Sequence, residues 1–491
     1  MNSKQVLKRN LTSQGKVGVF SVGHDEYWDQ FPGLKDKLIK HYDYFVSKLE
    51  ENTAVNIIES QGICDNNREA FKTGDFFARK DLDIIMCFLS TYTPSGNVLP
   101  VLRKLDIPII LVALQPEKAM DYENATTAMQ LENDNLTSLP EVSNSLIRSN
   151  KKVEDCVVGH LYDDEAAWDT LFTWCQIAEV LNVLNNAKIG YLGHVYEGML
   201  DMNSDPTMFT GHFGMHVKYL EMEDLKSQIS LVSEKEQKDM LDKIDKIFKF
   251  PDPKIDPLTS KVKKEDLEWP ARVACGMEKL VENLELDGLA YYYRGNEGNE
   301  NEKIQAAMII GNSFLTTRGI PVAGEADLKN CVAMLIMDRF KAGGSFCELH
   351  PADFKENLVL VGHDGPHHLG IADGKPVLRN LQLYHGKSGQ GPSVEYKLKE
   401  GPITILGLTQ TFEGQFKMVV AEGESLAGPI PATGNTNTRG FFKPDLKTFL
   451  KNWSLEGPTH HFALGTGHIA HKIKMLANCL DVECKLVTPE D

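Results

Sequence analysis

The C-terminal third of the sequence concentrates side chains that bind metal ions. The stretch VGHDGPHHLG (361–370) holds three histidines and an aspartate, and THHFALGTGHIAHK (459–472) holds four more histidines. Nine of the fifteen histidines follow residue 349. Imidazole nitrogens bind many divalent transition-metal ions. The clusters therefore indicate either a metal site or ordinary polar loops, since most loop histidines only form hydrogen bonds.

Two glutamates stand in settings that favour a specific role. Glu325, in GIPVAGEADLKN (319–330), follows an apolar segment and precedes a helix. Either Glu325 or Asp327 caps that helix, or Glu325 is a functional carboxylate whose pKa the helix dipole lowers. Glu348, in GGSFCELHPADF (343–354), has apolar neighbours. Burial of an unpaired carboxylate is costly, so Glu348 is either partly buried and paired or functional.

Taken together, these side chains form a mixed oxygen and nitrogen ligand set. Two carboxylates, Glu325 and Glu348, would join His363 and one histidine of the pair His460–His461. Such a set suits Mn²⁺ or Co²⁺ better than structural zinc. The nine cysteines contain no CxxC pair, so neither a zinc ribbon nor a disulfide framework is indicated. Because the ligands are far apart in the sequence, the fold must bring them together.

The elements that would position these residues form three predicted domains. Strands rich in Val, Ile and Leu alternate with helical patterns in residues 1–185, for example KVGVFSVG and IPIILVALQ. A second such pattern starts at KIGYLG and fills residues 186–345. Residues 346–491 instead show successive strands with Gly-rich turns. The predicted fold class is α/β, with two parallel-sheet αβ domains (flavodoxin/Rossmann-like) followed by a mostly antiparallel, β-barrel-like domain.

Composition excludes several classes of function. Acidic residues outnumber basic ones by 69 to 52, giving a formal charge of −17, which argues against binding nucleic acid or an anionic membrane. No apolar run approaches the roughly 18 residues of a membrane span, and the N-terminus does not have the pattern of a signal peptide. No GxxxxGK[ST] loop supports phosphoryl transfer from ATP. We expect a cytoplasmic protein.

Four strings resemble, in order and spacing, motifs of the L-arabinose isomerase family. GEADLKN, GGSFCE, LVLVGH and THH stand where that family usually has GEGDWKT, GTSFMED, LVLGSH and GGAHH. CVVGHLYDDEAAWDTLFTWCQIAEVL (156–181), KIGYLGHVYEGMLDMNSD and FLSTYTPSG are similar to further family segments. The resemblance extends over nearly the whole chain.

The resemblance implies an aldose–ketose isomerase with a monosaccharide substrate and a divalent metal, usually Mn²⁺, with Co²⁺ or Mg²⁺ as alternatives. It implies a homo-oligomer, with a hexamer and active sites between subunits as the expected form. The implied metal ligands are Glu325, Glu348, His363 and His461, with His460 as the alternative to His461. Glu325 and Glu348 would also be catalytic and move protons through an ene-diol, although a hydride shift would need the same metal. The implied substrate-binding residues are His24, Tyr27, Tyr196 and His460, with His367 and His368 either behind the metal ligands or beside the substrate.

The chain departs from the family where the sugar binds. VGHDEYW (22–28) replaces the family's QHLYG, DGPHHLG replaces MLEVCP after His363, Tyr196 stands where a methionine is usual, and Arg294 stands near a usual phenylalanine. These differences leave three alternatives to L-arabinose isomerisation open. They are isomerisation of another aldose such as L-fucose or D-arabinose, epimerisation, and non-catalytic sugar binding. A sugar binder would need no metal site.

Overall fold

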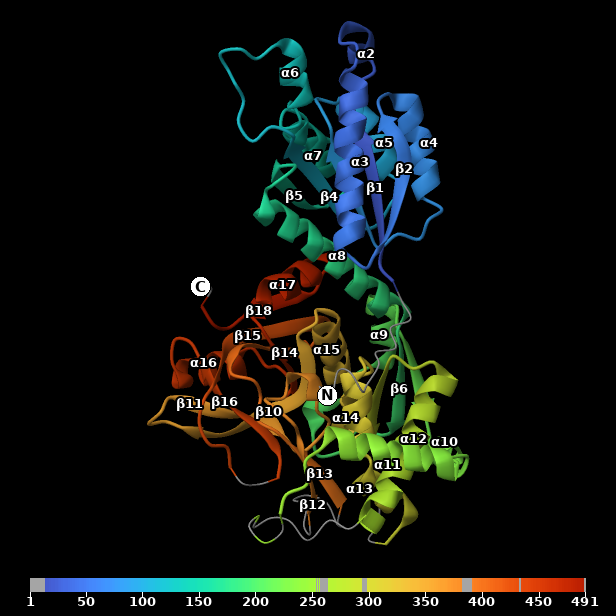
Figure 1. Ribbon diagram of the computed structural model, residues 1–491, viewed down its shortest axis with the longest axis vertical. Coiled ribbons are helices and arrows are strands. Elements are labelled where there is room, and N and C mark those ends of the chain that lie inside the picture. The colour runs from blue at the N-terminus through green and yellow to red at the C-terminus, as the bar shows by residue number, and fades with distance from the viewer. Residues whose placement is uncertain are drawn as a thin grey trace. The chain divides into compact units, whose positions relative to one another are not determined.

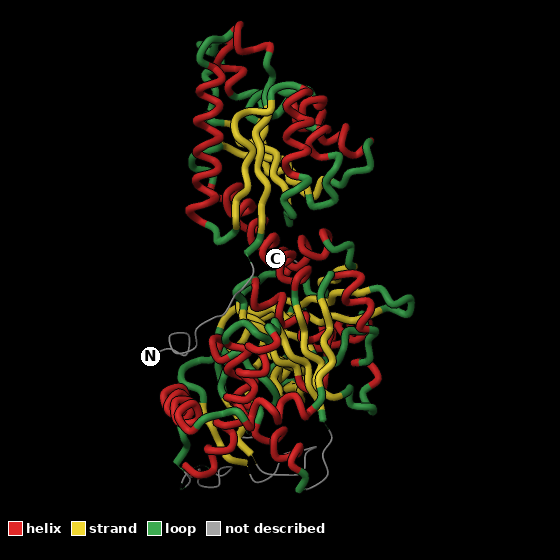
Figure 2. Tube along the Cα trace, turned by 90° about the vertical axis from the view of Figure 1, so that its right-hand side faces the viewer, coloured by secondary structure: helices red, strands yellow, loops and turns green. Residues whose placement is uncertain are grey.

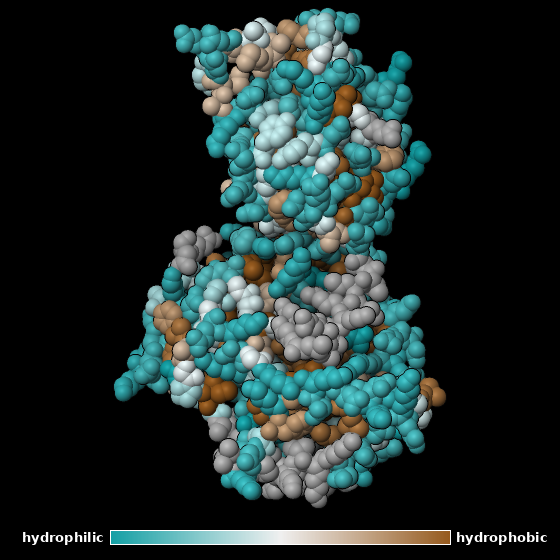
Figure 3. Space-filling model, in the orientation of Figure 1, coloured by the Kyte–Doolittle hydropathy of each residue, from teal (hydrophilic) through white to brown (hydrophobic). Residues whose placement is uncertain are grey.

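The computed structural model describes residues 14–252, 254, 256, 264–293, 298–381, 391–431 and 434–489. The chain divides into two compact units, residues 12–183 and 184–491. The predicted three-domain division stays a prediction. Among the described residues, none of the helices has the length and apolar character needed to cross a bilayer. The face seen in Figure 3 is largely hydrophilic, with scattered apolar side chains.

Residues 12–183 form a five-stranded parallel sheet flanked by helices (Figures 1 and 2). The strand order β2-β1-β3-β4-β5 is the flavodoxin-like order. All of β3 and nearly all of β1 are buried, as expected for a parallel sheet covered by helices on both faces. The strands are β1 (Lys16–Val22), β2 (Asn56–Cys64), β3 (Ile84–Leu89), β4 (Ile109–Gln115) and β5 (Val153–His160). The helices are α2 (Glu26–Gln30), α3 (Leu34–Asn52), α4 (Asn67–Phe77), α5 (Leu99–Leu102), α6 (Thr127–Glu132), α7 (Ser138–Arg148) and α8 (Glu165–Asn186).

A second parallel sheet, in the order β7-β6-β8-β9, begins the unit of residues 184–491. Its strands are β6 (Lys188–Gly193), β7 (His216–Leu220), β8 (Gly288–Tyr292) and β9 (Val322–Ala323). The helices of this region are α9 (Pro206–Phe213), α10 (Met222–Ser230), α11 (Glu234–Ile247), α12 (Lys264–Leu284), α13 (Glu300–Ala307), α14 (Ile309–Thr317) and α15 (Leu328–Arg339). The carboxyl ends of parallel strands lie at one edge of a sheet, so the loops after β6, β8 and β9 share that edge.

The C-terminal strands close into an antiparallel barrel. Six strands follow one another in the order β14-β17-β10-β11-β16-β15, and pairing of β14 with β15 completes the ring. A seventh, β18 (Glu483–Leu486), adds in parallel to β15. The ring strands are β10 (Gly343–Asp353), β11 (Leu358–His363), β14 (Gly401–Gln410), β15 (Phe416–Leu426), β16 (Thr436–Phe442) and β17 (Phe462–Thr466). The ribbon β12 (Val377–Leu381) and β13 (Gly391–Glu395) and the helices α16 (Leu446–Leu455) and α17 (Ala470–Cys479) complete the region.

Helix α15 connects the second parallel sheet to the barrel. It contacts β8 and β9 of the sheet as well as β10, β14 and β17 of the barrel. Every residue of this helix is buried, including Lys329, Asp338 and Arg339. The sequence predicted a helix after Glu325, and the structure encloses that helix on all sides. Its N-terminus therefore enters the interior between the sheet and the barrel.

The predicted α/β class is confirmed, including both parallel sheets and the barrel. Strand β10 was not predicted, because its sequence opens with Gly-Gly-Ser instead of a run of β-branched residues. The structure explains one of the glycines. Gly344 has a φ of 111°, and a Cβ added there would lie 2.7 Å from the Met334 carbonyl oxygen of α15. Close approach of the helix backbone therefore requires glycine at this position.

Candidate metal centre

Strand register gathers three of the predicted ligands at one end of neighbouring barrel strands. Glu348 on β10 stands opposite Gly362 on β11, and Cys347 stands opposite Phe462 on β17. His363 and His461, each next to one of those paired residues, therefore flank Glu348. Ligand atoms of Glu348, His363 and His461 all lie within 4.8 Å of one another.

Glu325 reaches the same cluster from the second parallel sheet. It follows β9 in a short 3₁₀ turn (Gly324–Ala326), and its Oε2 lies 3.1 Å from Nε2 of His461. Glu325, His460 and His461 form a second group of ligand atoms within 4.8 Å. Glu325 and Ala326 both adopt left-handed backbone conformations, with φ of 57° and 58°. Such strain is costly in residues other than glycine and gathers at functional sites, where surrounding structure holds it.

Asp327 fixes the orientation of His461. Its Oδ1 accepts the backbone N–H of Asn330 at 3.0 Å and caps α15. Its Oδ2 lies 3.2 Å from Nδ1 of His461, and both side chains are completely buried. A carboxylate bound to one imidazole nitrogen directs the other nitrogen toward a metal. Asp327, and not Glu325, is therefore the cap, and it performs a second task that the sequence did not reveal.

The charges at the centre hold the buried histidine in its cationic form when no metal is bound. Burial by itself would lower the pKa of His461, but the contacts with Asp327 and Glu325 outweigh it and raise that pKa to about 9. Burial likewise would raise the pKa of Glu325, yet contact with His461 and the nearby His363 hold it below its ordinary value. A divalent cation would replace the proton on His461, since metal ligands bind in their deprotonated forms.

Unsatisfied atoms around the centre fit a bound cation. Among the described residues, Oε2 of Glu325, Nδ1 of His363 and Nε2 of His461 are buried without an aligned hydrogen bond. Buried polar atoms of this kind are rare and call for an explanation such as an ion. The ring of Phe346 packs against both histidines, with centroid distances of 4.7 Å to His363 and 4.3 Å to His461. An apolar wall beside two carboxylates and two imidazoles suits a divalent ion of the Mn²⁺ type.

The remaining histidines of the opening clusters have distinct surroundings. Nε2–H of His367 donates to the carbonyl of His363 at 3.0 Å, and burial lowers the pKa of His367 to about 3. Nδ1 of His368 accepts from Gly370 N, and its Nε2 lies 3.5 Å from Asp338. His460 is held by Asp201, whose Oδ2 accepts both its backbone N–H and its Nδ1–H. His367 therefore supports the loop of His363. His460 lies beside His461, with ring centroids 3.8 Å apart, but is held by Asp201.

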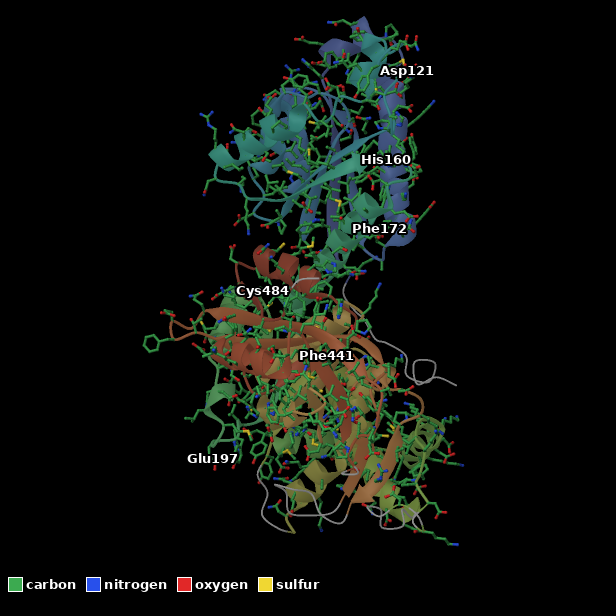
Figure 4. The ribbon with its side chains drawn as sticks, turned by 90° about the vertical axis from the view of Figure 1, so that its left-hand side faces the viewer. Asp121, His160, Phe172, Glu197, Phe441 and Cys484 are labelled. Carbon is green, nitrogen blue, oxygen red and sulfur yellow. The ribbon has the colours of Figure 1, made fainter. Side chains whose placement is uncertain are left out.

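The other predicted sugar-binding residues stay predictions. Tyr196 follows β6, and its ring lies 5.5 Å from that of Tyr292 at the end of β8. The same loop carries Glu197, which Figure 4 places at the edge of residues 184–491. His24 belongs to the other compact unit, where its ring contacts Tyr27 at 4.9 Å. Arg294 lies outside the described residues.

Three residues near the centre were missed by sequence reasoning. Asp327 carried a signal, since it follows Glu325 by two positions, but that signal was read only as a helix cap. His350, whose Nε2 lies 3.8 Å from Oε1 of Glu348, stood in the segment already chosen. Asp201 lies more than 250 positions from His460, and nothing in MLDMN (199–203) distinguishes it from an ordinary loop aspartate.

Comparisons with known proteins relate the chain to sugar isomerases. A family model described as the L-arabinose isomerase C-terminal domain matches residues 343–483, the segment that forms the barrel. An L-arabinose isomerase from a Nocardioides species is 23% identical over 472 residues, covering 93% of this chain and 91% of the relative. L-arabinose isomerase 1 of Bacillus licheniformis is 20% identical, covering 82% and 80%. A sulfoquinovose isomerase of Priestia aryabhattai is 22% identical, covering 66% and 70%.

These relatives extend over most of the chain, and the domain match contains all three residues of the group formed by Glu348, His363 and His461. Glu348 and His363 lie on β10 and β11 inside the matched segment, and His461 immediately precedes β17. The relatives include both L-arabinose and sulfoquinovose isomerases. The similarity therefore indicates a sugar isomerase but does not identify its substrate. The domain match and the relatives that cover most of the chain together support the L-arabinose isomerase family and indicate an enzyme of the aldose–ketose isomerase class.

Proposed function

We propose that this enzyme is a metal-dependent isomerase that converts L-arabinose, or a related aldose, into its ketose. The observation that carries the proposal is the convergence of Glu325, Glu348, His363 and His461 in two overlapping groups that share His461. Mn²⁺ is the ion we favour, with Co²⁺ or Mg²⁺ as alternatives, because the donor set contains oxygen and nitrogen atoms and no thiolate.

The four residues have a clear division of tasks in this proposal. His363 and His461 would hold the ion with Glu325 and Glu348, and Asp327 would orient His461. When bound, the ion polarises the sugar carbonyl and stabilises negative charge that develops beside it. Ligand atoms of Glu325, His363 and His461 that are buried without an aligned hydrogen bond support this assignment.

The two glutamates are placed to move the protons of an ene-diol route. In that route a base takes the proton from C2 of the aldose and returns a proton to C1, while the hydroxyl proton on O2 moves to O1. Glu325 has a lowered pKa and is ionised at neutral pH, so it can accept a proton. Glu348 is accessible to a substrate, since 29% of its side chain is exposed. A hydride shift would use the same centre without a carbon base.

The identity of the sugar is the open part of the proposal. The match to sulfoquinovose isomerases adds a second candidate class, an aldose that carries an anionic substituent. L-Fucose and D-arabinose remain candidates because the loops around His24 and Asp364 differ from the family pattern. We further propose a homo-oligomer, with a hexamer as the expected form. The non-catalytic alternative fits poorly with membership in a family of enzymes.

The first experiment measures ketose formation from L-arabinose, D-galactose, L-fucose, D-arabinose and sulfoquinovose by EDTA-treated protein, with and without added Mn²⁺. We expect one of these aldoses to give ketose only in the metal-loaded sample. Stoichiometric Mn²⁺ binding without turnover of any aldose would contradict the substrate range but keep the metal centre. A protein that binds no Mn²⁺ would contradict the ligand set itself.

Replacing Glu348 with glutamine tests the proton-transfer role. Glu348→Gln keeps the side-chain shape and one oxygen but removes the base, and we expect kcat to fall by at least about 100-fold. The matched control is Glu356→Gln, because Glu356 is an exposed glutamate at the turn between β10 and β11 and pairs only with Arg439 among the described residues. Steady-state kinetics on the best aldose would measure both. Near-normal turnover of Glu348→Gln would end the assignment of Glu348 as a proton-transfer group.

A further inference from the structure

The two adjacent histidines of the THH string lie side by side but differ in burial. His461 is completely buried and belongs to both groups of ligand atoms. The side chain of His460 is 35% exposed, and its ligand atom joins Glu325 and His461 but not the group that contains Glu348 and His363. A solvent-accessible imidazole beside a buried ion-binding cluster lies where a sugar would enter.

Asp201 determines how His460 is presented. One oxygen, Oδ2, accepts the backbone N–H of His460 at 2.9 Å and its Nδ1–H at 2.7 Å. This pair of bonds fixes the ring about both its backbone and its side-chain torsions. Because Nδ1 is the donor to Asp201, Nε2 is left as the nitrogen available to a ligand. Among the described residues, Nε2 of His460 has no hydrogen-bond partner.

The turn that carries Asp201 is itself anchored. It belongs to a short 3₁₀ segment (Leu200–Met202) after β6, in which Met202 is completely buried. Lys329, in the first turn of α15 and almost wholly buried, donates from Nζ to the carbonyls of Met202 at 3.1 Å and Asn203 at 2.9 Å. The start of α15 therefore positions both histidines: Asp327 holds His461, and Lys329 holds the turn whose Asp201 holds His460.

From this arrangement we infer that Asp201 is a positioning residue that aims Nε2 of His460 at a hydroxyl group of the bound sugar. The inference rests on the proposed function and adds to it a residue that selects and orients the monosaccharide. His460 then contacts substrate and does not hold the ion. Loss of Asp201 frees the ring to rotate, so sugar binding weakens while the ion stays bound.

The test compares Asp201→Ala with the parent enzyme in the Mn²⁺-loaded state. The probe is the alditol of the aldose that turns over, L-arabinitol in the case of L-arabinose, because an alditol binds without reacting. We expect its Kd to rise about 10-fold, the effect of losing one well-oriented hydrogen bond, while the Kd for Mn²⁺ changes less than about twofold. Asp205→Ala is the matched control, since Asp205 caps α9 in the same loop without touching His460. We expect Asp201→Asn, whose amide oxygen can still accept, to recover most of the binding.

A double-mutant cycle shows whether Asp201 acts through His460. We expect His460→Ala to weaken alditol binding as much as Asp201→Ala does, and the double variant to lose no more than either. Losses that multiply, an unchanged alditol Kd in Asp201→Ala, or a parallel loss of Mn²⁺ affinity would each overturn the inference.

A second cycle separates failure of the inference from failure of the proposed function. In EDTA-treated protein, Asp201 and His460 stabilise the fold through their mutual hydrogen bonds. The decrease in Tm of the double variant should therefore be smaller than the sum of the decreases in Asp201→Ala and His460→Ala. Additive decreases would overturn the inference whatever the parent does to sugars. A parent enzyme that binds neither Mn²⁺ nor any alditol would instead contradict the proposed function.

Discussion

Replacement of His461 with asparagine is expected to abolish metal binding and isomerisation together. His461 is the one residue common to both groups of ligand atoms, so its loss breaks each of them. Removing an outer-shell partner already costs 10- to 100-fold in metal affinity, so removing this ligand should weaken Mn²⁺ binding by more than about 100-fold. Isothermal titration with Mn²⁺ on EDTA-treated protein measures the affinity, and the aldose assay measures turnover.

The same substitution should also destabilise the metal-free protein. Oδ2 of Asp327 and Oε2 of Glu325 lie 3.2 Å and 3.1 Å from the two nitrogens of His461, so without the imidazole two carboxylates face each other in the interior. Breaking a buried ion pair typically costs about 3 kcal/mol or more in the free energy of unfolding. His468→Asn is the control, because His468 is partly exposed. Among the described residues, its Nε2 bonds the Gly423 carbonyl and approaches Glu424. A His461→Asn protein that binds Mn²⁺ like the parent would show that His460 is the ligand.

The sequence predicted those parts of the fold that hydrophobic pattern determines. Strands such as β1, β3 and β4 are runs of apolar residues in a sheet buried on both faces, and these runs are visible without tertiary information. Strand β5 was missed because it lies at the edge of its sheet, and Val157 is its only buried residue. Strand β10 was missed because a packing constraint, the approach of α15, selects its glycine.

The site was predictable as residue types but not as geometry. Glu325, Glu348, His363 and His461 stood out through resemblance and composition, while their meeting depends on the register of β10 with β11 and β17. That register is a property of the closed barrel and has no local signature. Which residues bind the ion stays a prediction until metal binding is measured. The roles of the supporting carboxylates, Asp201 and Asp327, were harder to predict. The sequence around an aspartate does not show that a distant histidine donates a hydrogen bond to it.

Replacing Asp327 with alanine removes its two tasks, helix capping and orientation of His461. Both are lost at once, and we expect Mn²⁺ affinity to fall about 10- to 100-fold because His461 is no longer held by a carboxylate. Unfolding should also become easier, by about 1 kcal/mol for the cap and by a further 1–3 kcal/mol for the buried Nδ1–H left without an acceptor. Titration with Mn²⁺ and thermal unfolding of EDTA-treated protein measure the two effects.

The barrel offers a matched control for the capping part of this prediction. Asp445 caps α16 in the same manner, accepting the backbone N–H of Thr448 at 3.0 Å, but it lies at the surface of another element and touches no histidine among the described residues. Asp445→Ala should therefore cost about 1 kcal/mol of stability and leave Mn²⁺ affinity unchanged. If Asp327→Ala behaves like Asp445→Ala in both measurements, Asp327 is only a helix cap, and His461 does not depend on it. If Mn²⁺ affinity falls in Asp327→Ala alone, the residue that caps α15 is also needed to assemble the metal centre. Folding at the start of α15, where it meets the barrel, is then coupled to metal binding.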